Sequence, residues 1–156
     1  MPPPDKPKPS LRARALRLLA RREHTRAELE AKLSGEDTDA DELAAVLDDF
    51  SRRGWISDAR VIEQVTHARR TRFGSRRIRQ ELENKGVSGE LIAEAMTGLK
   101  ESDLEAARGV WRRKFGCAPA NAKERARQLR FLQSRGFALD LAMRVVREAG
   151  QDPEES

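Results

Sequence analysis

The stretch VIEQVTHARRTRFG, from Val61 to Gly74, returns 42 residues later as DLEAARGVWRRKFG, which ends at Gly116. The two copies align Ile62 with Leu104, carry basic residues near their ends and finish on Phe-Gly. Their apolar residues recur at intervals of three and four, which is the spacing of one face of an α-helix. A repeated helical segment indicates a protein built from copies of one small unit.

Glycines mark the ends of further helices. Glycine is the residue that most readily adopts the left-handed conformation that closes a helix. Eight of the ten glycines follow a stretch with helical periodicity, namely Gly35, Gly54, Gly74, Gly86, Gly98, Gly116, Gly136 and Gly150. We therefore expect nine helices and no strand.

Helix start signals lie between these glycines. A Ser, Thr, Asp or Asn that is followed three residues later by Glu has the spacing of a capping box. The pairs of this kind are Thr25–Glu28, Asp39–Glu42, Ser102–Glu105 and Asn121–Glu124, and the plain N-cap candidates are Ser10, Asp58, Ser75 and Ser88. Each signal predicts the first turn of one helix.

The expected helices divide into three groups of three. The second helices of the last two groups end alike, since Lys85-Gly86-Val87 matches Arg135-Gly136-Phe137. We expect an all-α protein with three tandem three-helix repeats, at residues 10–57, 58–100 and 101–150. Because each repeat buries its helices against near neighbours, the repeats are expected to form an elongated, curved array. A disordered Pro-rich tail at 1–9 and a polar tail at 151–156 complete the predicted organisation.

The composition favours this extended design over one round core. Only 38% of the residues are apolar and 37% are charged. Cys117 is the single cysteine, which excludes a disulfide framework and a CxxC metal pair. The N-terminal MPPPDKPKP lacks the apolar stretch of a signal peptide, and no window approaches the roughly 20 apolar residues of a membrane span. We expect a cytoplasmic monomer that does not bind membranes.

Several segments, in order and spacing, resemble the RecX family of RecA regulators. They are REHTRAEL at 22–29, GWISDAR at 54–60, RIRQEL at 77–82, KGV at 85–87, the Ala107–Phe115 stretch and RGF at 135–137. The resemblance covers about residues 11–149. It implies a protein without enzymatic activity, with three tandem three-helix repeats bent into a crescent, that binds RecA and the RecA filament on single-stranded DNA. The family's members block filament growth and suppress the ATPase and strand exchange of RecA, so roles in DNA repair, recombination and the SOS response are implied.

Charge is distributed in blocks that indicate where a partner binds. Residues 28–50 carry nine acids and one base, Arg69–Arg79 carries six arginines and no acid, and Arg108–Arg135 carries nine bases and one acid. Like charges on neighbouring turns repel each other, so a run of this kind points to an anionic partner. The candidate binding residues are Arg69, Arg70, Arg72, Arg76, Arg77, Arg79, Lys85, Arg112, Arg113, Lys114, Lys123, Arg127 and Arg130.

The orientation of these side chains follows from their positions on the expected helices. Arg70 lies opposite the apolar Val61 side of its helix and is expected to point outward, whereas Arg69 and Arg72 lie nearer the core edge, where carboxylates of the fold are alternative partners. A helix start at Ser75 would offer backbone N–H groups to a phosphate beside its arginines. A second stripe, spaced i, i+4, i+7, consists of Lys123, Arg127 and Arg130.

Any contact with DNA is expected to be weak and directed to the backbone. The sequence has no Tyr, and its Phe and Trp residues mostly occupy positions typical of a buried core, so base stacking has little support. An alternative function is a stand-alone helix-turn-helix protein that binds DNA through the Ser75–Val87 segment. Such a module would hold duplex DNA on its own, whereas a filament regulator would need RecA.

Catalytic and metal-binding constellations find no support in the sequence. His24 and His67 have no second His or Cys at ligand spacing, and Cys117 has no base nearby in sequence. Asp37, Asp39 and Asp41 imitate the start of a calcium loop, but the sixth position is Glu42 rather than Gly and the twelfth is Asp48 rather than Glu. We expect no enzyme activity, no cofactor and no metal.

Overall fold

The computed structural model describes residues 8–151, which contain eight α-helices and no strand. The predicted all-α class is therefore confirmed. The predicted tails at 1–9 and 151–156 lie outside the described residues, except for Lys8, Pro9 and Gln151, which are not in a helix. None of the helices in the described part is long and apolar enough to cross a membrane.

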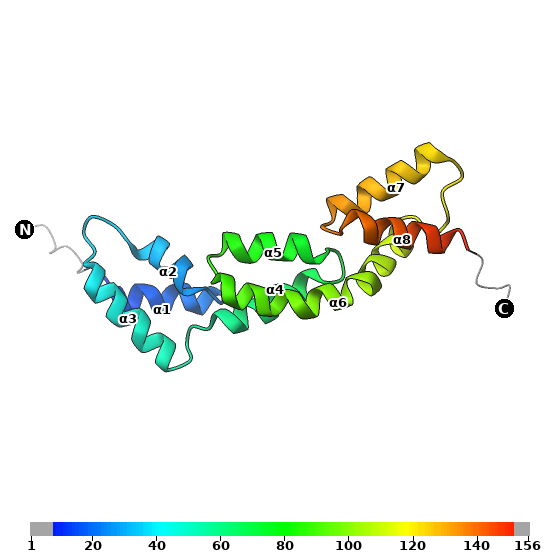
Figure 1. The fold of residues 1–156 in the computed structure, drawn as a ribbon. Helices are drawn as coiled ribbons and strands as arrows, with labels where there is room; N and C mark the ends of the chain where they lie inside the picture. Colours follow the sequence, from blue (N-terminus) through cyan, green and yellow to red (C-terminus); the bar gives the residue numbers. More distant parts are fainter. Residues whose placement is uncertain (1–7, 152–156) are drawn as a thin grey trace, which may run out of the picture. The chain divides into compact units, whose positions relative to one another are not determined.

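The helices belong to two compact units. The described residues up to Val61, together with Lys85–Val87, form the first unit, which contains α1 (Leu11–Arg21), α2 (Arg26–Leu33) and α3 (Ala40–Arg52) (Figure 1). Its core includes Leu29, Leu47 and Phe50, whose side chains have no exposed surface. Trp55 packs on Phe50 with 5.3 Å between the ring centroids.

The second unit contains Ile62–Asn84 and the described residues from Ser88 onward. It holds most of α4 (Asp58–Arg69), and all of α5 (Ser75–Asn84), α6 (Gly89–Lys114), α7 (Ala122–Ser134) and α8 (Leu139–Ala149). Helix α6 packs against α5, α7 and α8, and α7 lies beside α8 (Figure 1). Leu132, Phe137 and Ala142 are at the centre of this packing, with at most 1% of their surface exposed. The indole N–H of Trp111 donates to the buried amide oxygen of Gln128 at 2.8 Å.

Most of the predicted helix starts are confirmed. Thr25 and Glu28 form a complete capping box, and the side chains of Ser10, Asp39, Ser88 and Asn121 each accept a hydrogen bond from a backbone N–H in the first turn of the helix that follows. Three positions differ. Asp58 and Ser75 are the first residues of α4 and α5 rather than their caps, and Ser102 lies inside α6. At the start of α4, the hydroxyl of the preceding Ser57 accepts from the N–H of Arg60 at 3.1 Å.

The prediction of nine helices is wrong, because α6 is continuous over 26 residues. Gly98 lies inside it rather than at an end, and the hydroxyl of Ser102 bonds back to the carbonyls of Gly98 and Leu99 at 3.2 Å instead of capping a new helix. The buried side chains continue through this region at helical spacing, from Ile92, Met96 and Leu99 to Asp103, Ala107 and Val110. A continuous buried stripe stabilises the helix across a glycine that costs only about 1 kcal/mol. Helix α6 therefore closes the second three-helix group and opens the third, and the boundary expected at residue 100 falls within it.

Candidate functional site

A buried carboxylate on α6 positions the arginine-rich turn between α4 and α5. Asp103 is 7% exposed, and its Oδ1 accepts from the backbone N–H of Ser75 at 3.0 Å while its Oδ2 accepts from the Ser75 hydroxyl at 2.5 Å. The first N–H groups of a helix have no partner within the helix, and an acidic group there also interacts favourably with the helix dipole. Asp103 therefore acts as the cap of α5 from a different helix.

The same carboxylate holds Arg70. The Arg70 guanidinium donates to Asp103 at 2.8 Å, to the carbonyl of Leu99 at 2.5 Å and to the hydroxyl of Ser102 at 2.6 Å. Only 17% of the Arg70 side chain is exposed. The prediction that Arg70 points outward is wrong, because α6 places a buried acid beside the end of α4. Arg70 is thus a structural residue of this turn rather than a free contact residue.

The α4–α5 turn also lies directly against the α7–α8 turn. The N–H of Gly74 donates to the carbonyl of Arg135 at 2.7 Å, and the N–H of Arg76 donates to the carbonyl of Gly136 at 3.2 Å. Gly136 has a φ of 94°, and a Cβ at this position would lie 2.6 Å from the backbone nitrogen of Arg77. The two turns therefore meet backbone to backbone, where only glycine fits.

This packing sorts the arginines of the second unit into two groups. Arg69 pairs with Glu81 at 3.1 Å, Arg79 pairs with Glu83 at 3.0 Å and Arg108 pairs with Glu148 at 3.0 Å. Hydrogen bonding to Glu81 raises the pKa of Arg69. Within residues 8–151, no ion pair forms at Arg72, Arg76, Arg77, Arg112, Arg113, Lys114 or Arg135. Of the two arginines for which a carboxylate of the fold was the alternative partner, Arg69 binds one, whereas Arg72 is exposed and pairs with none among the described residues.

Four of the unpaired cations line one hollow of about 270 Å³, which we call the basic hollow. Its lining residues are Arg72, Val110, Arg113, Lys114, Phe131 and Arg135. They come from the α4–α5 turn, the last turns of α6 and the end of α7. One guanidinium nitrogen of Arg113 also donates to the carbonyl of Thr71. The two basic segments that the sequence singled out, Arg69–Arg79 and Arg108–Arg135, therefore contribute to one surface.

Aromatic rings hold some of these cations in place. The guanidinium of Arg135 lies 4.9 Å from the ring centroid of Phe131 and 5.5 Å from that of Phe73. Lys114 lies 5.4 Å from Phe131, and Arg77 lies 5.0 Å from Phe73. Cation–π contacts of this length are attractive and restrict the cation's movement. Arg135 was not among the binding residues predicted from the sequence. The signal that could have found it is the match between Arg135-Gly136-Phe137 and Lys85-Gly86-Val87, since Lys85 was among those residues.

Other predicted site residues lie elsewhere. Lys123, Arg127 and Arg130 are exposed on α7, but none of them lines the basic hollow. Arg112 is exposed in the last turn of α6, outside the hollow's lining. Lys85 belongs to the first unit, where its backbone carbonyl accepts the Thr25 hydroxyl at 2.5 Å.

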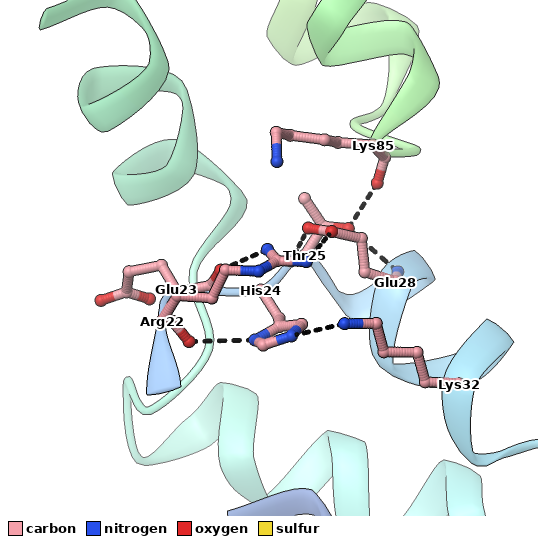
Figure 2. Close-up of polar contacts among 7 residues, drawn as sticks. All are labelled: Arg22, Glu23, His24, Thr25, Glu28, Lys32 and Lys85. Atoms are coloured by element: carbon pink, nitrogen blue, oxygen red, sulfur yellow. Dashed lines mark hydrogen bonds and ion pairs between the residues drawn. The ribbon is translucent and has the colours of Figure 1, made fainter. Parts of the chain in front are cut away.

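The first unit contains a buried histidine that the sequence left without a role. His24 is 1% exposed, and its Nδ1 lies 2.9 Å from the carbonyl of Arg22 while its Nε2 lies 3.1 Å from the ammonium of Lys32 (Figure 2). A neutral ring with its proton on Nδ1 satisfies both contacts, since it donates to the carbonyl and accepts from Lys32. Burial lowers the pKa of His24, and the positive charges of Arg22 and Lys32 lower it further.

The histidine lies beside the capping box of α2. The N–H of Thr25 donates to Glu28 at 3.0 Å, and Arg22 pairs with the same carboxylate at 2.8 Å (Figure 2). Burial acts to raise the pKa of Glu28, but the hydrogen bonds from Arg22 and Thr25 outweigh it, so the pKa lies below its usual value. His24 and its neighbours thus form a structural cluster that holds the chain between α1 and α2.

Comparison with family models places this architecture among known proteins. The chain matches the models for the first, second and third three-helix domains of RecX at residues 12–50, 57–96 and 101–146. The second match ends and the third begins inside α6, which agrees with the shared helix.

Relatives of similar length match along most of the chain. A protein named Regulatory protein RecX from Leptothrix cholodnii is 49% identical over 95% of this chain and 94% of its own. One of the same name from Chromobacterium violaceum is 46% identical over 92% of this chain and 93% of its own.

Solved structures share the fold. The crystal structure of RecX from Lactobacillus salivarius superimposes with a TM-score of 0.77 at 18% identity, over 90% of this chain and 94% of that one. A crystal structure of a regulatory protein RecX gives a TM-score of 0.68 at 22% identity, over 86% of this chain and 70% of that one. With three domain models matched in order and relatives nearly half identical along its length, the chain belongs to the RecX family.

Proposed function

We propose that this chain is a regulator that binds the RecA recombinase and the RecA filament on single-stranded DNA. In this role it restrains filament growth, ATP hydrolysis and strand exchange, and so modulates DNA repair, recombination and the SOS response in the cytoplasm. Membership of a family whose relatives are named as regulatory proteins supports the general role. The observation that carries the partner is the group of unpaired cations on the second unit.

These cations suit a large anionic partner because the fold holds them without neutralising them. A surface arginine gains little stability for its own protein, and several unpaired cations close together repel each other. The backbone contacts between the two turns keep the cations together despite this repulsion. A nucleoprotein filament presents a long array of negative charges, and association with it would be steered by charge and weakened by salt.

An alternative function is that of a stand-alone DNA-binding protein. Arg76 and Arg77 are exposed in the first turn of α5, where a helix-turn-helix protein presents its contacts to the major groove. Phe73 and Phe131 already have cations against their rings, which leaves them poorly placed for stacking on unpaired bases. Titration of duplex DNA without RecA separates the two functions, since the stand-alone protein would bind it tightly and with sequence preference.

The direct test is ATP hydrolysis by RecA on circular single-stranded DNA, with increasing amounts of the purified chain. We expect hydrolysis to fall as the chain is added, and no inhibition at any ratio would exclude the proposal. The double variant Arg72→Glu with Arg113→Glu should inhibit less than the wild type, because it reverses two charges of the basic hollow. The matched control is Arg125→Glu with Arg147→Glu, which changes the net charge equally at exposed positions outside the hollow.

A further inference from the structure

We propose that the basic hollow is a binding site for a backbone phosphate of single-stranded DNA, with Arg135 as its clamping residue. This inference deepens the proposed function by assigning a ligand to one surface of the regulator. Arg135 was not among the binding residues predicted from the sequence, and its position depends on the hydrogen bonds between the α4–α5 and α7–α8 turns.

The charge of the hollow favours an anionic ligand. Four cationic side chains line it, and none of them has a carboxylate partner among the described residues. The helix dipoles do not neutralise them. The C-terminal ends of α4, α6 and α7 are close in sequence to these cations, and each helix end carries about half a negative charge. Together they offset at most about one and a half of the four positive charges.

The geometry favours a phosphate over a carboxylate. A carboxylate is planar and is satisfied by the fork of one arginine, whereas the oxygens of a phosphate diester point in different directions. The hollow offers donors from separate elements, since Arg72 follows α4, Arg113 and Lys114 end α6 and Arg135 follows α7. Donors that converge from several elements match the tetrahedral group.

Arg135 is the residue best prepared for this contact. Its guanidinium is held near the rings of Phe73 and Phe131, and its side chain is half-buried. The position of its backbone is also defined, because its carbonyl accepts the N–H of Gly74 at 2.7 Å. A guanidinium that is already restricted loses less conformational entropy when it binds a ligand.

The apolar lining of the hollow fits the sugar that accompanies a phosphate. Val110 and Phe131 line the hollow together with the four cations. A deoxyribose brings C–H groups that need no hydrogen bond, whereas an acidic peptide would bring backbone amides that lose water without gaining a partner there. Because Lys114 and Arg135 lie against Phe131, the contact is directed to the sugar and phosphate and is tolerant of base sequence.

The test is binding of an end-labelled oligo(dT), followed by fluorescence anisotropy over a range of salt concentrations without RecA. We expect Arg135→Gln to weaken binding about tenfold, as expected for one lost charge-assisted hydrogen bond. It should also reduce the slope of log K against log salt by about 0.7, the value for one phosphate contact on a single strand. The control Arg147→Gln removes the same charge from an exposed position on α8 and should leave the affinity and the slope near the wild type.

A second variant guards against a folding defect in Arg135→Gln. Arg72→Gln removes an exposed hollow cation that has no cation–π contact within residues 8–151, and circular dichroism should show unchanged helicity. It should reduce affinity and slope in the same direction. Wild-type behaviour of a folded Arg135→Gln or Arg72→Gln, or a wild type that does not bind oligo(dT), would overturn the assignment of this ligand.

Two competitors test the chemistry. Displacement of the labelled strand by poly-glutamate as effectively as by unlabelled oligo(dT), at equal charge, would show a site for acidic polypeptide and overturn the inference. Tighter binding of duplex DNA than of oligo(dT), if it depends on Arg135, would also overturn the assignment to single strands.

The RecA assay keeps this inference separate from the proposed function. An Arg135-dependent oligo(dT) site without RecA inhibition rejects only the proposed function, and inhibition without that site rejects only the phosphate assignment.

Discussion

Gly74 donates its backbone N–H to the carbonyl oxygen of Arg135 at 2.7 Å, across 61 positions of sequence. This bond joins the turn after α4 to the turn after α7. It places the arginines of one repeat beside those of the next. The geometry of the basic hollow therefore depends on two turn glycines as much as on the cations themselves.

The first prediction concerns the space at Gly74. A Cβ at this position would overlap the carbonyl oxygen of Gly136 and lie 2.7 Å from the Phe137 ring, so the two turns would have to separate. We expect Gly74→Ala to lower the free energy of unfolding by about 2 kcal/mol. Urea denaturation followed by circular dichroism measures this change.

Gly98→Ala is the matched control for this substitution. A Cβ at Gly98 meets no heavy atom within 4 Å, and the residue lies inside α6. Replacing an unconstrained helical glycine with alanine should stabilise the protein by about 0.5–1 kcal/mol. Both substitutions add one methyl group, but Gly74→Ala is expected to lower the free energy of unfolding and Gly98→Ala to raise it. Equal changes in the two variants would show that the contact between the turns is not tight.

The second prediction concerns Asp103, which serves both Arg70 and the start of α5. Asp103→Ala would leave a largely buried guanidinium and the Ser75 N–H without their acceptor. We expect a loss of about 3 kcal/mol in the free energy of unfolding, since removing one member of a buried pair strands the other. Asp103→Asn retains an acceptor oxygen and should lose less.

A nearby acid on the same helix provides the control. Glu105 is exposed, and its carboxylate lies 3.6 Å from Arg108. Glu105→Ala should change the free energy of unfolding by less than about 0.5 kcal/mol, because an exposed pair contributes little. An Asp103→Ala protein as stable as Glu105→Ala would mean that the buried network does not hold the turn.

The repeat in the sequence aligns positions that are buried in both copies, but it does not show what they contact. Val61 and Asp103 occupy equivalent places in the two copies, and they are 3% and 7% exposed. Only the folded chain shows that the second of them accepts hydrogen bonds from the α4–α5 turn. A local pattern encodes the inward face of a helix, whereas partners distant in sequence depend on how the helices pack.

The glycines show the same limit. Gly116 has a φ of 71° and follows the end of α6, as the sequence predicted. Its counterpart Gly74 is not left-handed, and is required instead by the close approach of Gly136. Gly98 neither ends a helix nor approaches another chain segment. One residue type thus has three different roles that helical periodicity does not distinguish.

The third prediction follows from the lowered pKa of His24. The unfolded chain binds a proton at this histidine near its ordinary pKa of 6.5, whereas the folded state, in which burial lowers the pKa, resists protonation. The contribution of His24 to stability is therefore complete above pH 6.5 and is lost as the pH falls from 6.5 through the lowered folded pKa. The free energy of unfolding should decline over this range.

The control for this titration is His24→Gln, which cannot take up the proton. Its free energy of unfolding should change less with pH just below 6.5 than that of the wild type, whatever its absolute stability. Glu28, Asp49 and Glu148 also have lowered pKa values, so their contributions are present above their ordinary pKa near 4 and are lost at more acidic pH. Parallel pH profiles for the two proteins just below pH 6.5 would contradict the role assigned to the buried ring.

The last prediction separates the basic hollow from the stripe on α7. Arg72, Arg113 and Arg135 converge on one hollow, whereas Lys123, Arg127 and Arg130 are exposed along one helix and line no part of it. Both sets carry three positive charges, so changing each set to Gln alters the net charge equally.

If only a general attraction between charges mattered, both triple variants would lose inhibition of RecA by the same factor. If the hollow is a binding site, inhibition should fall more in the hollow variant, because its three cations bind one ligand together. The exposed cations on α7 each contribute little to binding. We expect the hollow variant to need about a hundredfold more protein for half-inhibition, and the stripe variant no more than about threefold.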